Sequence, residues 1–200
     1  MRYGKGHKDA SRQRIMEVAG ERFRSDGIAA SGLSTIMSDA GLTNGAFYPH
    51  FKSKADLVRE SVAAAMDDQC MTLRQIIAED GLEAALAAYL SPEHRDSPES
   101  GCTLAALLPE LARQPLDTRS VYMERFLQAA AEIASALPPE AGDSTDVAIA
   151  LYATLIGTLQ LARAVNGTPL SDRILQSGAQ AARELARRGL GDYKSGGAAH

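Results

Sequence analysis

Apolar residues recur at helical spacing along the chain, and no segment shows the apolar–polar alternation of a half-buried strand. The first run carries Ile15, Val18 and Phe23 and is stopped by Gly27. We therefore predict an all-α fold. Further helices are predicted over 33–40, 42–49, 82–90, 102–113, 117–137, 146–165 and 171–188, with a long helix between a capping box at 53–56 and a break at Gly81.

Proline and polar residues mark further interruptions. Pro109 is expected to kink the helix in which it lies. Residues 91–98 are polar and contain two prolines, which predicts a loop. The polar tail 191–200 is predicted to be disordered.

Composition is typical of a globular protein, with 45% hydrophobic and 23% charged residues among 200. No apolar segment follows the first methionine, so no signal peptide is indicated. Two cysteines do not make a secreted disulfide framework. The longest uncharged apolar stretch, 147–162, is shorter than the roughly 20 residues that a spanning helix needs. We expect a soluble, cytoplasmic protein without a membrane segment.

Charge is distributed unevenly. Residues 1–60 hold 10 Lys and Arg against 7 Asp and Glu, whereas the chain as a whole has a net charge of −4. The basic N-terminal part suits an anionic partner, but an excess this small also arises by chance, so charge alone decides nothing.

The sequence lacks the short motifs of common enzymes, including G-x-S-x-G, H-E-x-x-H, the P-loop and C-x-x-C. Its four histidines are scattered without the spacing of metal ligands. We therefore predict a protein that is not an enzyme and has neither a metal site nor a cofactor.

Residues 27–58 hold the most informative pattern. Two short helices are joined at Ala40-Gly41-Leu42, where small residues allow a close crossing of the kind found in a helix-turn-helix. The second helix begins with the small and polar residues Thr43, Asn44 and Gly45, which can meet base edges in a major groove. Potential phosphate donors follow at Tyr48, His50, Lys52 and Lys54.

This segment resembles the DNA-binding domain of the TetR family of bacterial repressors. One departure is Met37, where many members carry alanine. The resemblance implies a nine-helix layout and a homodimer that binds double-stranded DNA at a palindromic operator. Its pattern and spacing are met by Ser31, Ala40-Gly41, Thr43, Gly45, Tyr48, His50-Phe51 and Lys54.

Several DNA-contact candidates also have a structural interpretation, which for His50 is a surface or capping role. Asn44 suits either base readout or capping of the helix start. Tyr48 suits phosphate contact better than the core, whereas Phe51 is predicted to be core. A lysine in the first turn of a helix, as at position 54, opposes the helix dipole and therefore favours a phosphate partner. The predicted DNA-binding set is Ser31, Thr43, Asn44, Gly45, Tyr48, His50 and Lys54.

The predicted domains are residues 8–60, with the helix-turn-helix at about 31–50, and an effector-binding and dimerisation domain at 61–190. The segment 146–165 is apolar on nearly every face, so it must be buried on several sides. The resemblance implies that it pairs with 171–188 and their mates across a dimer interface. The predicted interface residues are Ala148, Leu151, Leu155, Gly157, Ile174, Gly178, Ala181 and Ala182.

A small apolar effector is expected within the second domain, among flexible and aromatic side chains. Cys102, at a predicted helix start, suits either packing or a reactive thiolate. A Gly-Cys pair at this place resembles one subgroup of TetR-type regulators, some of which sense electrophiles or oxidants through that cysteine. Cys70 is predicted to be core. The predicted pocket residues are Met66, Tyr89, Cys102, Leu104, Leu108, Tyr122, Phe126 and Tyr152.

Overall fold

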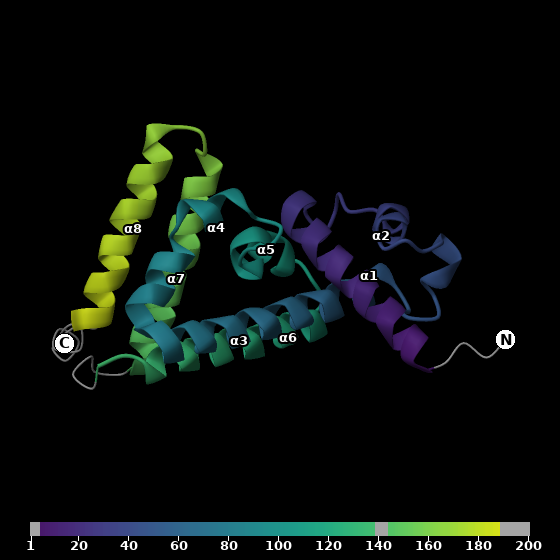
Figure 1. Cartoon of the computed structure of the whole chain (residues 1–200), viewed down its shortest axis with the longest axis horizontal. Helices are drawn as coiled ribbons and strands as arrows, with labels where there is room; N and C mark the ends of the chain where they lie inside the picture. The colour runs from purple at the N-terminus through teal and green to yellow at the C-terminus, as the bar shows by residue number, and fades with distance from the viewer. Residues whose placement is uncertain (1–4, 139–143, 189–200) are drawn as a thin grey trace, which may run out of the picture. The chain divides into compact units, whose positions relative to one another are not determined.

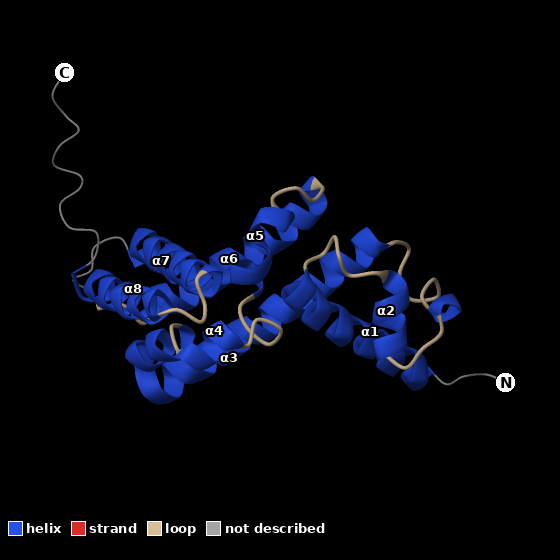
Figure 2. Cartoon of the chain, turned by 90° about the horizontal axis from the view of Figure 1, so that it is seen from above, coloured by secondary structure: helices blue, strands red, loops and turns tan. Residues whose placement is uncertain are grey.

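The computed structural model describes residues 5–138 and 144–188, so the predicted disordered tail 191–200 lies outside the described residues. Over the described ranges the chain forms eight α-helices and one 3-10 helix, η1, and no strand (Figures 1 and 2). The all-α prediction is confirmed. The elements are α1 (Lys5–Asp26), α2 (Leu33–Asp39), η1 (Asn44–Ala46), α3 (Lys54–Tyr89), α4 (Pro92–Asp96), α5 (Thr103–Leu111), α6 (Leu116–Ser135), α7 (Ser144–Ala164) and α8 (Pro169–Arg188).

The chain divides into two compact units. One consists of Met1–Gln69 with Ser97–Arg125, and the other of Cys70–Asp96 with Phe126–His200. The long helices α3 and α6 contribute to both units. The boundary predicted between residues 60 and 61 separates a DNA-binding domain from an effector-binding and dimerisation domain. It concerns function and stays a prediction.

The first unit is built around buried aromatic and aliphatic side chains. Phe23 of α1 is fully buried, as are Phe47 and Phe51 after η1, which confirms the core position predicted for Phe51. Met37 of α2 is also fully buried, so the longer side chain is accommodated at this position. Burial of this kind supplies most of the stability of short helices that are marginal in isolation.

The second unit contains the antiparallel pair α7 and α8, which lie side by side in Figure 1. A β-carbon added at Gly178 of α8 would lie 2.2 Å from Thr158 Cγ2 of α7, so the two helices approach closely at this point. The helix α7 has 21 residues, and an 18-residue segment of it has a mean hydropathy of 1.5, so it has the length and composition of a spanning helix although the uncharged stretch 147–162 was expected to be too short. Half of this 18-residue segment is buried inside the protein, as in the core helix of a globular protein.

Two predicted elements differ from the structure. The helix predicted over 42–49 is reduced to η1, because Gly45 has low helix propensity and Pro49 has no N–H with which to continue a helix. The loop predicted over 91–98 contains α4, in which Pro92 takes the first helical position and the Ser91 hydroxyl accepts from the backbone N–H of His94 at 3.1 Å.

Of two predicted helix signals in α3, the break at Gly81 is confirmed and the capping box at 53–56 forms in part. Gly81 has a φ of 85°, so the helical backbone is interrupted there as expected. At the start of the helix, the Ser53 hydroxyl accepts from Asp56 N at 3.1 Å. The Asp56 carboxylate accepts from Lys52 N at 3.1 Å, one residue before the partner that a capping box would use.

Candidate nucleic-acid interface and effector region

The turn between α2 and η1 is fixed by its backbone. Gly41 has a φ of 73°, a left-handed conformation that glycine adopts without steric cost. Its N–H donates to Ser38 O at 2.9 Å, and Leu42 N donates to Met37 O at 2.9 Å. This pair of bonds is the Schellman arrangement, which ends α2 and sets the direction of the chain into η1.

The segment after this turn presents polar side chains to solvent. Thr43, Asn44 and Gly45 are exposed, and Tyr48 is 73% exposed. The buried side chain of Phe47 attaches this segment to the core, and its ring makes an edge contact with the ring of Tyr48 at 5.4 Å. The exposed Tyr48 ring agrees with the contact interpretation and not with a core position.

Asn44 does not occupy the position of a helix cap. The residue before the first turn of η1 is Thr43, and no side chain caps that turn. The capping interpretation of Asn44 is therefore not supported, and its exposed amide remains available to a partner.

Two further candidates are engaged inside the first unit. Ser31 is only 4% exposed, and its hydroxyl donates to Gly27 O at 2.7 Å and to Arg22 O at 3.1 Å. This burial corrects the view of Ser31 as a direct contact, because the hydroxyl stabilises the turn after α1. Lys54 is half-buried and its ammonium donates to Ile28 O, so the cation at the start of α3 has a partner within the protein.

His50 lies beside cationic residues of α1. Its imidazole is half-buried, and burial together with the charges of Lys8 and Arg12 lowers its pKa below the ordinary value. The guanidinium of Arg12 also lies 4.9 Å from the centre of the Phe51 ring. Because Arg12 also pairs with Glu60, the positive charge that this part of α1 adds next to the turn after η1 is that of the exposed Lys8.

In the second unit, three predicted pocket residues come together. The rings of Phe126 and Tyr152 are stacked at 5.4 Å, and Tyr89 makes an edge contact with Tyr152 at 6.4 Å. Tyr89 also meets His94, a neighbour that sequence reasoning missed because its segment was predicted to be a loop. The other predicted pocket residues belong to the first unit; they are Met66, Cys102, Leu104, Leu108 and Tyr122.

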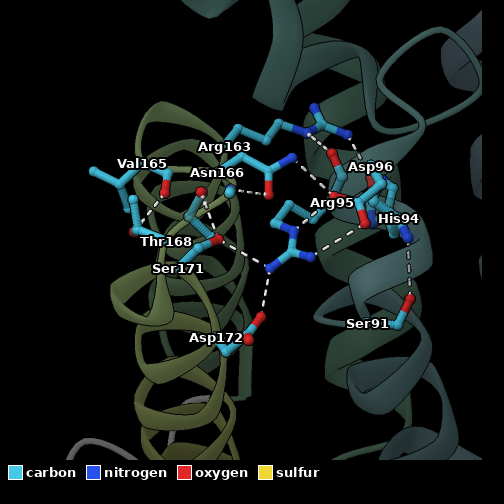
Figure 3. A network of polar contacts seen from close by, with 12 residues as sticks. Ser91, His94, Arg95, Asp96, Arg163, Val165, Asn166, Thr168, Ser171 and Asp172 are labelled. Carbon is cyan, nitrogen blue, oxygen red and sulfur yellow. Dashed lines mark hydrogen bonds and ion pairs between the residues drawn. The ribbon is translucent and has the colours of Figure 1, made fainter.

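A polar network joins α4 to the turn between α7 and α8 (Figure 3). Arg163 donates to His94 O at 2.7 Å and to Arg95 O at 3.1 Å, so it binds carbonyl groups of α4. Arg95 in turn pairs with Asp172 of α8 at 2.6 Å, and Asn166 donates to Asp96 at 2.9 Å. The network holds the short helix beside the aromatic cluster.

The two cysteines differ in burial. Cys102 is buried at the N-cap of α5, where its Sγ accepts from Ala105 N at 3.5 Å. Arg24, whose pKa is lowered by burial, interacts electrostatically with this sulfur. Cys70 is partly exposed, which corrects its prediction as a core residue.

The residues predicted for a dimer interface fall into two groups. Ala148, Leu151, Leu155 and Ala182 are buried within the single chain, and Gly178 faces Thr158. These residues pack α7 and α8 within their own chain, which corrects the expectation, implied by the resemblance, that they lie in the dimer interface. Gly157, Ile174 and Ala181 remain at least partly exposed.

No metal centre is evident in the part of the chain that the structure describes. Across 5–138 and 144–188, no three His, Cys, Asp or Glu side chains are close enough to hold an ion together.

Comparison with known proteins identifies the N-terminal region. Residues 15–61 match the family model described as "Bacterial regulatory proteins, tetR family". The chain is 27% identical over 121 residues to the HTH-type transcriptional repressor KstR2 of Rhodococcus jostii, covering 60% of this chain and 59% of that protein. It is 44% identical over 50 residues to the HTH-type transcriptional regulator AcrR of Shigella flexneri, covering 25% and 23%. The matches thus span less than two thirds of the length of these curated relatives.

Solved structures share the fold over most of the chain. A TetR transcriptional regulator from Chloroflexus aurantiacus superposes with a TM-score of 0.76 at 20% identity, covering 92% of this chain and 98% of that one. The reduced form of NemR from E. coli gives a TM-score of 0.74 at 20% identity, covering 88% and 96%. At this level of identity the likeness concerns the fold.

Proposed function

We propose that this chain, whose N-terminal domain belongs to the tetR family of bacterial regulatory proteins, is a ligand-responsive transcriptional repressor that binds a palindromic operator as a homodimer. The observation that carries the proposal is the exposed polar segment after the Schellman turn, within the residues that match the family. Repression is supported by the similarity to KstR2, which is a transcriptional repressor. A cytoplasmic location and a regulatory, non-enzymatic role follow from the same proposal.

The decisive experiment is selection of bound duplexes from a random pool. A two-fold symmetric protein with two reading segments should select a site with dyad symmetry and half-sites about one helical turn apart, or somewhat more. A helical ligand-binding protein that does not bind DNA would enrich no sequence. Such a protein would also show no salt-dependent binding to mixed-sequence duplex.

In the proposed complex, Thr43, Asn44 and Gly45 face the bases and Tyr48 faces the backbone. Their exposure supports this arrangement, and so does the exposed Lys8 near His50, whereas Arg12 pairs with Glu60. Phosphate contacts orient the protein, whereas contacts to base edges carry the sequence preference. These two classes of contact lead to different mutational effects.

Asn44→Ala is expected to relax the preference at one base pair in each half-site, with a loss of about 1–3 kcal/mol of discrimination. The reason is that an exposed amide can bond two edge atoms of adenine, which alanine leaves unmatched. Selection from the random pool measures this change. The exposed Ser38 of α2 provides a control, because Ser38→Ala should select the wild-type consensus. An unaltered consensus for Asn44→Ala would remove Asn44 from base readout.

Lys54→Ala is expected to weaken binding to all duplexes and to reduce the slope of log affinity against log salt by about one unit. The ammonium donates to Ile28 O, and its remaining N–H groups can still meet a phosphate. Titrations at several salt concentrations measure the slope. Arg119→Ala, which removes an exposed cation on α6, should leave the slope unchanged. If the Lys54 variant keeps the wild-type slope, its role is confined to the bond with Ile28.

We place the effector in the helical region after residue 60 and expect a small, mainly apolar molecule. The aromatic cluster of Tyr89, Phe126 and Tyr152 supports this location. Phenolic hydroxyl groups in an apolar surrounding suit ligands that need orientation by a few polar contacts.

A second candidate, thiol-based sensing, rests on the position of Cys102 at the N-cap of α5, where its Sγ accepts from Ala105 N. The burial of the Cys102 side chain favours a packing role for this residue instead. We expect Cys102→Ser to release operator DNA in response to the effector as the wild type does, and an electrophile to act on neither protein. Release of the wild type alone by an electrophile, measured by fluorescence anisotropy of labelled operator, would support the thiol.

The dimer interface is proposed on the exposed face of the α7–α8 pair. Ala153, Gly157 and Leu161 are spaced by four residues along α7, so they share one face of the helix, and Leu161 is 61% exposed. Ile174 and Ala181 are partly exposed on α8. Small residues next to a large apolar one allow helices of two protomers to approach closely.

A further inference from the structure

The carboxylate of Glu110 binds the backbone immediately before the helix-turn-helix. From the last turn of α5, its two oxygens accept from Ile28 N at 3.1 Å and from Ala29 N at 3.0 Å. These amides lie 82 and 81 residues away in sequence, in the turn between α1 and α2. A carboxylate that accepts two backbone N–H bonds forms a strong, directional contact because the acceptor is charged.

Gly27 leaves room for this contact. A β-carbon at Gly27 would lie 2.7 Å from Glu110 Oε1, and the φ of 88° at this position is one that side-chain-bearing residues rarely adopt. Other side chains bind the same turn, since Ser31 donates to Gly27 O and Lys54 donates to Ile28 O. The turn that leads into α2 is therefore held by three side chains, of which only Glu110 lies outside residues 15–61.

The helix that carries Glu110 is itself attached at its other end. Gln69 of α3 donates to Gly101 O at 2.9 Å and to Thr103 Oγ1 at 3.0 Å, and it accepts from Thr103 N at 3.1 Å. Arg24 of α1 binds Glu99 O at 2.6 Å, just before α5. These hydrogen bonds all lie within the first unit. They fix the position of α5 and therefore of the Glu110 carboxylate that it carries.

We propose that Glu110 is a positioning residue for sequence-specific DNA binding, because it holds the α1–α2 turn in the conformation that presents the reading segment to the operator. The proposal rests on the proposed function. A reading segment displaced by even a small distance loses its directional bonds to base edges, whereas phosphate attraction tolerates the displacement. Loss of the carboxylate contact should therefore reduce specific binding more than non-specific binding.

The test is Glu110→Gln, which keeps the length of the side chain but replaces one acceptor oxygen with an NH2 group that faces a backbone N–H. Affinity for the selected operator should fall about tenfold, the effect of one charge-assisted hydrogen bond, while affinity for mixed-sequence duplex at low salt stays the same. A loss of folded protein would lower both affinities by one factor, so their ratio separates positioning from stability. Glu124→Gln, an equal change of charge at an exposed site of α6, should leave the ratio unaltered.

Two further readouts keep the test decisive. Glu110→Asp retains the charge but is too short to reach both amides, so its ratio should lie between those of the wild type and Glu110→Gln. Hydrogen exchange at the Ile28 and Ala29 amides should accelerate in both variants. An operator-to-mixed-duplex ratio equal to that of the wild type in both variants would overturn the proposal. Failure of the wild type to select any operator would instead overturn the proposed function.

Discussion

Replacing Gly178 with valine is expected to lower the free energy of unfolding by about 3 kcal/mol or more, because the new side chain has no space between α7 and α8. A β-carbon at this position would lie 2.2 Å from Cγ2 and 2.3 Å from Oγ1 of Thr158, and both distances are far below van der Waals contact. Both atoms belong to a buried side chain of the neighbouring helix. Chemical denaturation followed by circular dichroism measures the loss.

A double-mutant cycle tests the cause of this loss. Thr158→Gly removes the atoms that the new side chain would meet, so the double variant should lose less stability than the sum of the two single changes. Gln176→Ala, on the exposed side of the same helix, should change stability by no more than about 0.5 kcal/mol. Additive losses in the cycle would show that the contact between Gly178 and Thr158 does not limit the side chain at this position.

Leu161→Glu is expected to yield monomers that remain folded. The side chain is largely exposed in the single chain, so the charge costs little there, but in the proposed interface it would be buried against a second copy. Binding to the palindromic operator should weaken at least about a hundredfold, because the second half-site contributes through linkage of the two protomers. Light scattering measures the mass, and the affinity for an isolated half-site should stay unchanged.

Leu116→Glu is the matched control for this prediction. Leu116 is 72% exposed at the start of α6, outside the proposed interface, so its charged variant should remain a dimer with wild-type operator affinity. A Leu161→Glu protein that is still dimeric would place the interface on another face. The interface positions Leu151 and Leu155, which the sequence analysis predicts, are unsuitable for this test because they are buried within the chain and their replacement would damage the core.

Much of the candidate DNA interface is predictable from sequence because its determinants are local. Gly41 must follow α2 for a Schellman turn to form. The aromatic residue at position 51 must be buried for the short segment after η1 to be stable. The exposure of Asn44 follows from its place after that turn. Ser31 and Lys54 were harder to interpret, since their partners are carbonyl groups that only the folded turn brings near.

The helical region shows the same division at longer range. The period of its apolar residues by itself determined that the protein is all-α, where most helices lie, and that Gly81 interrupts α3. Only the tertiary structure decided which apolar faces are covered by the chain's own helices, as at Leu151, and which remain open, as at Leu161. It alone revealed the contact of Glu110 with the turn before α2. The physical reason is that helix formation depends on neighbours within a few residues, whereas burial and hydrogen-bond partners depend on which distant segments pack together.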